Sequence, residues 1–232
     1  MTSLSKLSGP RAMAGGQWKG RRLGALTLAV TALACAGLVG CDKPGPGGSA
    51  ASDQAGSFHG VDITGANYAR HLKLKDVNGQ PRDLAEFKGK VVFVFFGFTQ
   101  CPDVCPTTMA ELAEVRKRLG DAGDRLQGVF VTVDPERDTS VVLKAYLEGM
   151  DPSFVGLRGT TEETENAARE FKVFYQKVPT KGDNYTMDHT AGAFVFDPDG
   201  QVRLFVRYGT KVDDLTADIR QLLLQASPSR KG

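Results

Sequence analysis

The sequence has little excess charge of either sign, only four cysteines and only three histidines. The formal net charge is +2, but residues 1–41 contain five basic side chains and no acidic one. The rest of the chain therefore has 24 of the 29 basic residues against all 27 acidic ones. This slightly acidic balance lacks the basic surface that binds nucleic acid, so we expect no nucleic-acid partner. With 41% apolar residues, the chain has enough material for a hydrophobic core.

The N-terminal segment has the layout of an export signal. Its basic stretch is followed by an uncharged apolar run over residues 23–40, LGALTLAVTALACAGLVG. This run is near the lower length limit for a membrane-spanning helix, so an uncleaved anchor or a plain secretory signal would also fit. The end of the run, Leu38 to Cys41 (LVGC), resembles the lipobox of bacterial lipoproteins. We therefore expect a signal peptide over residues 1–40 and a lipid on Cys41.

A short linker is expected to join this anchor to one domain. Residues 41–57, CDKPGPGGSAASDQAGS, consist largely of Pro, Gly, Ser and Ala and offer little to bury, which is typical of a flexible tether. The domain then covers residues 58–232, held at the cell membrane and facing the periplasm or another extracytoplasmic space. Because Cys35 is removed with the signal and Cys41 is lipidated, Cys101 and Cys105 remain as the thiols.

Alternating apolar strands and amphipathic helices predict an α/β fold. The run 89–96, GKVVFVFF, is typical of a central strand that is buried on both faces. A strand leading into a cysteine pair at a helix start favours a thioredoxin-like sandwich, in which helices flank a central β-sheet, with an added N-terminal hairpin. The patterns predict further strands at 128–133, 154–157 and 172–177, helices at 107–119, 138–149, 161–170 and 212–224, and hairpins at 71–79 and 193–206.

The two remaining thiols lie in the segment FFGFTQCPDVCP, residues 95–106. We expect Cys105 at the N-cap of the following helix and Cys101 in the loop above it. Free backbone amides at a helix N-terminus stabilise a thiolate and lower the pKa of a cysteine. This position therefore predicts chemically active thiols.

Several kinds of chemistry use paired cysteines. A structural disulfide would close so short a loop that it would constrain little of the unfolded chain. Dithiol oxidoreductases more commonly have C-x-x-C and a cis-proline before the late hairpin, where this sequence has Ala191. Peroxiredoxins place Ser or Thr three residues before the reactive cysteine, where this sequence has Pro102.

A metal site is the remaining class. Two thiolates suit a soft metal ion, and one more ligand would complete a trigonal site. His59 and His71 lie at the start of the domain, where we expect them at the surface. His189 precedes the late hairpin, in a segment that faces the cysteine turn in a thioredoxin-like fold. His189 is therefore the expected third ligand.

Residues near these positions receive simpler interpretations. Met109 and Met187 are expected to pack in the core rather than to act as thioether ligands. Asp188 is a candidate for orienting His189 through a hydrogen bond. The segment 134–138, DPERD, is interpreted as the end of a strand and the cap of a helix, without a chemical role.

Three separate motifs give the chain a specific resemblance. FGFTQCPDVCPTT, VTVDPERDT and YTMDHTAG, in this order and spacing, resemble the Sco/SenC family of copper chaperones, from Gly60 to the last helix. The resemblance implies that Cys101, Cys105 and His189 bind copper as Cu(I) or Cu(II). It also implies delivery of copper to the copper A centre in subunit II of cytochrome c oxidase.

The same resemblance implies a redox role, in which Cys101 and Cys105 form a reversible disulfide and keep the cysteines of the target reduced. A thiol–disulfide oxidoreductase without a primary metal role is the alternative function. The sequence identifies neither the upstream copper donor nor the thiol reductant. It assigns no catalytic residue.

Overall fold

The computed structural model describes residues 57–226. The expected signal peptide, the lipidation site Cys41 and nearly all of the tether lie outside these residues. The strands are β1 (Val61–Asp62), β2 (Leu74–Asp76), β3 (Pro81–Arg82), β4 (Val91–Gly97), β5 (Leu126–Thr132), β6 (Val155–Arg158), β7 (Tyr175–Pro179), β8 (Tyr185–His189), β9 (Gly192–Phe196) and β10 (Val202–Arg207). The α-helices are α1 (Val104–Arg118), α2 (Ser140–Glu148), α3 (Thr161–Glu170) and α4 (Val212–Gln225), with 3-10 helices at Leu84–Phe87 and Gly120–Arg125.

These strands form a large and a small sheet. The large sheet has eight strands in the order β1-β10-β9-β4-β5-β6-β2-β3, and the small sheet is the antiparallel pair β7-β8. At the centre, β4 pairs in parallel with β5 and antiparallel with β9. A parallel pair requires a crossover connection, which α1 supplies between β4 and β5. Strand β5 therefore lies next to β4, and the cysteine segment is part of the crossover that connects them.

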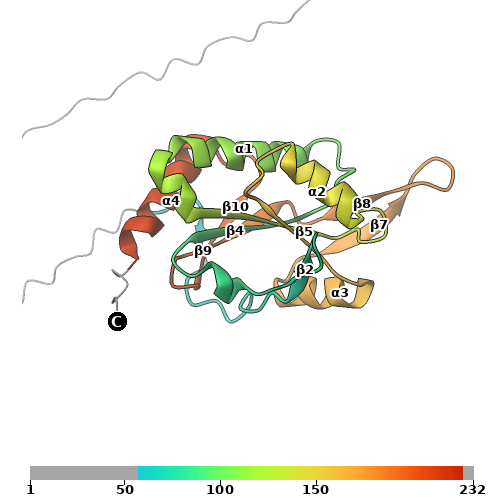
Figure 1. Cartoon of the computed structure of the whole chain (residues 1–232), viewed down its shortest axis with the longest axis horizontal. Helices are drawn as coiled ribbons and strands as arrows, with labels where there is room; N and C mark the ends of the chain where they lie inside the picture. The colour runs from blue at the N-terminus through green and yellow to red at the C-terminus, as the bar shows by residue number, and fades with distance from the viewer. Residues whose placement is uncertain (1–56, 227–232) are drawn as a thin grey trace, which may run out of the picture. The chain divides into compact units, whose positions relative to one another are not determined.

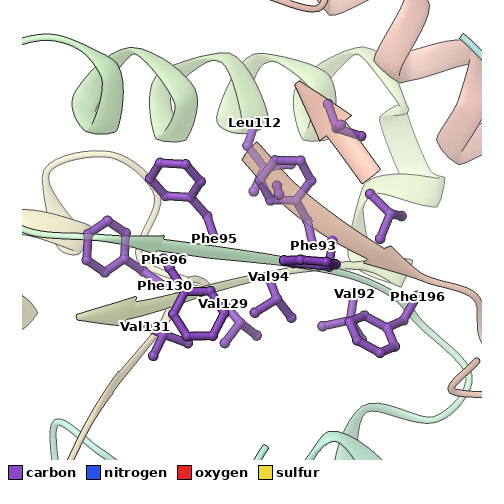
Figure 2. Packing of buried hydrophobic residues seen from close by; sticks show 14 of the residues in the cluster. Val92, Phe93, Val94, Phe95, Phe96, Leu112, Val129, Phe130, Val131 and Phe196 are labelled. Carbon is purple, nitrogen blue, oxygen red and sulfur yellow. The ribbon is translucent and has the colours of Figure 1, made fainter. Parts of the chain in front are cut away.

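Both faces of β4 are covered, as its apolar sequence predicts. All seven residues of this strand are buried. Successive side chains of a strand point to opposite faces, and Figure 2 shows Phe93 and Phe95 on the side of Leu112 from α1. Phe96 points to the other face, where its ring centroid lies 5.1 Å from that of Phe171. The core therefore consists of two apolar layers, one on each side of the sheet.

The helices divide between these two faces. Figure 1 shows α1, α2 and α4 on one face of the sheet and α3 on the other. Two glycines in the sheet leave space for the helices on the first of these faces. A Cβ at Gly128 would lie 2.9 Å from Leu112 of α1, and a Cβ at Gly156 would lie 2.8 Å from Leu147 of α2. This layered arrangement confirms the predicted thioredoxin-like α/β sandwich.

Both hairpins that the sequence predicted are present in the structure. The N-terminal hairpin is formed by β2 and β3, and its turn contains Gly79 at a φ of 79°, a left-handed conformation that favours glycine. The late hairpin is formed by β9 and β10.

None of the helices within residues 57–226 is both long enough and apolar enough to cross a lipid bilayer.

Other boundaries differ from the expectation. Helix α1 begins at Val104, so Cys105 lies in its first turn and Asp103, rather than Cys105, is the N-cap. Pro106 is tolerated at this point because the first-turn amides have no partner within the helix. The strand expected at 172–177 begins only at Tyr175, because Lys172 has a φ of 54° and the chain reverses there. Strand β8 was not predicted, since the polar segment YTMDH has no continuous apolar pattern.

Candidate metal centre

One group of side chains in the described part of the chain has the spacing of a metal site. It consists of Cys101, Cys105 and His189, whose ligand atoms all lie within 4.8 Å of one another. The sulfur of Cys105 lies 3.6 Å from Nε2 of His189. The backbone N–H of Cys105 donates a hydrogen bond of 3.4 Å to the sulfur of Cys101. The fold thus brings together the three residues that the sequence indicated.

The two sulfurs are placed by the junction between β4 and α1. Cys101 lies in the connecting loop, and Cys105 lies in the first turn of α1. Gly97 ends β4, and a Cβ added there would lie 2.9 Å from the sulfur of Cys105. The absence of a side chain at Gly97 therefore creates the space that this sulfur occupies.

The imidazole comes from the small sheet. His189 is the last residue of β8 and pairs with Tyr175 of β7. Its ring packs edge-on against Phe95 and Phe98, with ring centroids 6.0 Å and 5.8 Å away. The expectation that His189 lies near the cysteine turn is confirmed, but a strand of a separate hairpin carries it rather than a loop.

A backbone carbonyl fixes the chemical form of this imidazole. Nδ1 of His189 lies 3.1 Å from the carbonyl oxygen of Thr190. A carbonyl oxygen only accepts, so Nδ1 carries the proton and Nε2 presents its lone pair to the sulfurs. Burial lowers the pKa of His189, and the Thr190 carbonyl and the Asp188 charge oppose that shift. The Asp188 carboxylate is exposed, so the orienting partner is the carbonyl of Thr190.

The two thiols differ in their access to solvent. Both are free, with Cys105 fully buried and Cys101 partly exposed. Burial raises the pKa of Cys105, a hydrogen bond with the Phe98 backbone opposes that shift, and smaller effects of Cys101 and Asp138 add to it. The expected lowering of the pKa is therefore wrong for Cys105, because desolvation outweighs the helix N-terminus. Cys101 is the sulfur that a partner molecule can reach.

The segment 134–138 is hydrogen-bonded to the loop that contains Cys101. The Asp138 carboxylate is fully buried. It accepts hydrogen bonds from the N–H and hydroxyl of Thr99, at 3.1 Å and 2.6 Å, and from the hydroxyl of Thr132 at 2.5 Å. Asp138 thus ties the loop two residues before Cys101 to the end of β5. The helix cap itself is Thr139, whose side chain accepts from the N–H of Val142.

A second part of this segment contacts the hairpin that carries the imidazole. The hydroxyl of Tyr185, the first residue of β8, donates to the buried Asp134 carboxylate at 2.9 Å. Sequence reasoning gave neither Asp134 nor Asp138 a role at the site, although the DPERD motif was a signal that could have found them. Met109 and Met187 are both buried in the core, as expected.

Comparison with known proteins gives matches over most of this domain. The sequence model described as SCO1/SenC matches residues 61–224. The chain is 36% identical over 153 residues to "Protein SCO2 homolog, mitochondrial" of Mus musculus, covering 65% of this chain and 60% of that protein. The matches span less than two thirds of the length of this relative and of two Rickettsia relatives.

Solved structures match in fold as well as in sequence. Bradyrhizobium japonicum ScoI with copper bound is 38% identical, with a TM-score of 0.61, over 66% of this chain and 97% of that chain. The apo Sco1 protein from Thermus thermophilus is also 38% identical, with a TM-score of 0.63, over 72% of this chain and 97% of that chain.

Proposed function

This chain belongs to the SCO1/SenC family, and on that premise we propose that it is a copper chaperone whose ligands are Cys101, Cys105 and His189. The observation that carries the proposal is the meeting of two free thiols and one imidazole lone pair within 4.8 Å. The similarity to a ScoI structure that holds copper supports the choice of metal. Copper is the cargo of the protein in this proposal.

The donor set suits both oxidation states of copper. Cu(I) prefers thiolate ligands, whereas Cu(II) accepts imidazole together with thiolate. Both sulfurs must lose their protons to bind, so loading releases protons. Because Cys101 is partly exposed, a ligand of a second protein can approach copper from this side and take it by stepwise exchange. The fully buried Cys105, together with His189, would hold the ion during that exchange.

The family resemblance and the N-terminal sequence support a proposal for the destination of the copper and for the location of the protein. The proposed acceptor is the copper A centre in subunit II of cytochrome c oxidase. The proposed anchor is a lipid on Cys41, placed after a signal peptide over residues 1–40, with residues 41–57 as the tether. The domain over residues 58–232 would then face the periplasm or another extracytoplasmic space. A tether raises the effective concentration of the donor near a membrane-bound acceptor.

A redox role of the same thiols is the second candidate. The two sulfurs lie within 4.8 Å of each other, so a disulfide requires a local shift to the bonded distance of about 2.05 Å. The dithiol form would reduce a disulfide of the target while Cys101 and Cys105 become oxidised to their own disulfide. Oxidation also removes two of the three copper ligands, so binding of copper and formation of the disulfide exclude each other.

Anaerobic copper titration of the reduced chain tests the primary function. We expect one copper ion per chain by metal analysis and a thiolate-to-copper absorption band with Cu(II). His189→Ala should lose the band and Cu(II) binding while retaining the ability to form the disulfide. The matched control is His71→Ala, which removes an exposed imidazole and should bind as the wild type does. Full Cu(II) binding by His189→Ala would favour the oxidoreductase alternative.

A further inference from the structure

Glu111 of α1 is partly buried, and its carboxylate has neither a hydrogen bond nor an ion pair within residues 57–226. The next carboxylate of the same helix, Glu114, forms an ion pair of 2.8 Å with Arg118. Burial raises the pKa of Glu111, and no neighbouring cation opposes that shift. Because removing a charge from water without a counter-charge costs free energy, Glu111 is a candidate for binding a positive group of another molecule.

This carboxylate lines a narrow cleft that α1 forms with β9, β10 and the loop before α4. Other residues that line the cleft are Phe95, Thr108, Tyr208 and Thr210. The cleft offers about 20 Å³ to the centre of a water-sized group, which is enough for one such group. The side chain of Tyr208 is 42% exposed, so an apolar surface is open to solvent at the cleft. These features fit one small polar head on an apolar stem.

The polar groups of the cleft are hydrogen-bond acceptors. The hydroxyl of Thr108 donates to the carbonyl oxygen of Val104 at 2.7 Å, and the hydroxyl of Thr210 donates to the carbonyl oxygen of Arg207 at 2.8 Å. Since each hydroxyl has only one proton to donate, both oxygens are left to accept. Together with Glu111 they give the cleft three acceptor groups.

The side chain of Arg207 does not neutralise this cleft. Val206 pairs with Ala193, which pairs in turn with Phe95, and Phe95 lies on the α1 side of the sheet (Figure 2). Arg207 follows Val206 in β10, so its side chain points to the opposite face. Among the described residues that line the cleft, Glu111 therefore has the only charged side chain on this face.

One aromatic ring separates the cleft from the metal centre. Phe95 lines the cleft, and its ring packs edge-on against the imidazole of His189, with ring centroids 6.0 Å apart. A Cβ at Gly97 would lie 2.9 Å from both the Phe95 ring and the sulfur of Cys105. A protein that approaches the metal centre can therefore reach the cleft with a neighbouring side chain.

We propose that the Glu111 cleft is a docking subsite for a lysine side chain of the protein that exchanges copper with the metal centre. The inference rests on the proposed copper function. The three donors of an ammonium group match the Glu111 carboxylate and the two threonine oxygens, and the methylene stem packs on the ring of Tyr208. Lysine fits this space better than arginine, because an ammonium is a compact charge and a guanidinium is a larger planar group.

The subsite is tested first without copper and without a protein partner. The probe is n-butylammonium, which has the head and stem of a lysine side chain, and n-butanol is its uncharged counterpart. In the metal-free full chain, nuclear magnetic resonance should show saturable shifts at Glu111 and Tyr208 with n-butylammonium only. Absence of saturable shifts in the wild type, or equal shifts with n-butanol, would overturn the inference and leave the copper function standing.

Two variants separate the Glu111 carboxylate from the general charge of α1. Glu111→Gln should raise the dissociation constant of n-butylammonium about tenfold, the effect of one hydrogen bond between charged groups. Glu114→Gln removes the same charge one turn along the helix and should leave that constant unchanged, because its carboxylate is already paired with Arg118. Equal effects of the two variants would mean that only net charge matters, which would overturn the subsite.

The identity of the partner is tested by zero-length cross-linking of the copper-loaded chain to the soluble copper A domain of subunit II. A carbodiimide activates the Glu111 carboxylate, a lysine amine attacks it to form an amide, and the reagent leaves as its urea. Mass spectrometry should locate this bond at Glu111. Cross-links at other carboxylates only, or from Glu111 to a second copy of this chain, would overturn the inference. A wild type that binds n-butylammonium but no copper would overturn the proposed function while the amine site itself remained.

Discussion

The guanidinium of Arg137 lies over the ring of Tyr185, 3.7 Å from its centroid, and donates a hydrogen bond of 2.7 Å to the Tyr185 carbonyl oxygen. Asp134 joins this pair, because it accepts from the Tyr185 hydroxyl and forms an ion pair with Arg137. Tyr185 begins the strand that ends at His189. The contact therefore fixes the imidazole-bearing hairpin to the segment that follows β5.

Loss of this contact should affect Cu(II) more than Cu(I). In Arg137→Ala the hairpin is held less firmly, so we expect Cu(II) binding, which needs the imidazole, to weaken about tenfold, the effect of about one lost charged hydrogen bond. Cu(I) can remain on the two thiolates and should weaken less. Parallel titrations with the two ions measure the difference. Lys177→Ala is the control, since Lys177 lies 4.8 Å from the same ring but forms an exposed ion pair worth little. Equal weakening of both ions would contradict a specific effect on His189.

Replacement of Asp138 should destabilise the fold and the cysteine loop together. Asp138→Ala leaves the donors of Thr99 and Thr132 without their buried acceptor. Because each unpaired buried donor costs about 1–3 kcal/mol, we expect a loss of about 3 kcal/mol or more in the free energy of unfolding, measured with urea. The exposed Asp121→Ala should stay within about 0.5 kcal/mol of wild type. A similarly small change for Asp138→Ala would show that the loop does not depend on this carboxylate.

Copper affinity should increase with pH. Burial raises the pKa of Cys105 above its ordinary value, so this thiol is protonated at neutral pH and copper must displace the proton. The Cu(I) dissociation constant should fall by about tenfold per pH unit for each proton displaced between pH 6 and pH 8. Chelator competition at several pH values measures the slope. In Cys105→Ser the slope should be smaller by the contribution of one proton. A dissociation constant independent of pH would mean that the thiols are already ionised.

His59 should make a pH-dependent contribution to stability at the start of the domain. Its Nδ1 lies 2.9 Å from the buried Asp218 carboxylate, and that hydrogen bond, with the charges of Asp218 and Asp214, raises the pKa of His59. A raised pKa means that the contribution is fully present below the unfolded pKa of about 6.5 and is lost as pH rises through the folded pKa.

The corresponding variant is His59→Asn, which keeps a neutral donor near Asp218. The thermal midpoint of wild type minus that of the variant should be larger at pH 5.5 than at pH 8. His71→Asn, at an exposed histidine, should show no such difference between the two pH values. A constant difference for His59→Asn would contradict a role for its positive charge.

The anchor is tested by Cys41→Ser, which lies outside the described residues. The variant should remain unprocessed at the end of the signal peptide and carry no acyl chain. Mass spectrometry of membrane-extracted protein distinguishes the lipidated wild type from the variant. Wild-type protein without an acyl chain would exclude the lipoprotein form.

Local sequence patterns were enough to predict the main strands, the helices and the candidate ligands. The unbroken apolar run of β4 requires cover on both faces, and both faces are covered. The turn residue Gly79 and the helical spacing after Cys105 located the first hairpin and α1 to within a few residues. The choice of His189 as third ligand also came from sequence, because few histidines were available and only one preceded the late hairpin.

How these residues act together depends on contacts between distant segments, which local patterns do not contain. Cys105 and His189 are separated by 84 positions in the sequence. Their side chains meet because β7 pairs with β8, and no apolar pattern predicted that pair. The direction of the Cys105 pKa was predicted wrongly, because the pattern shows a helix start but not the layers that exclude water from it. Local periodicity records which face of an element is buried, whereas desolvation and hydrogen-bond partners depend on contacts between distant segments.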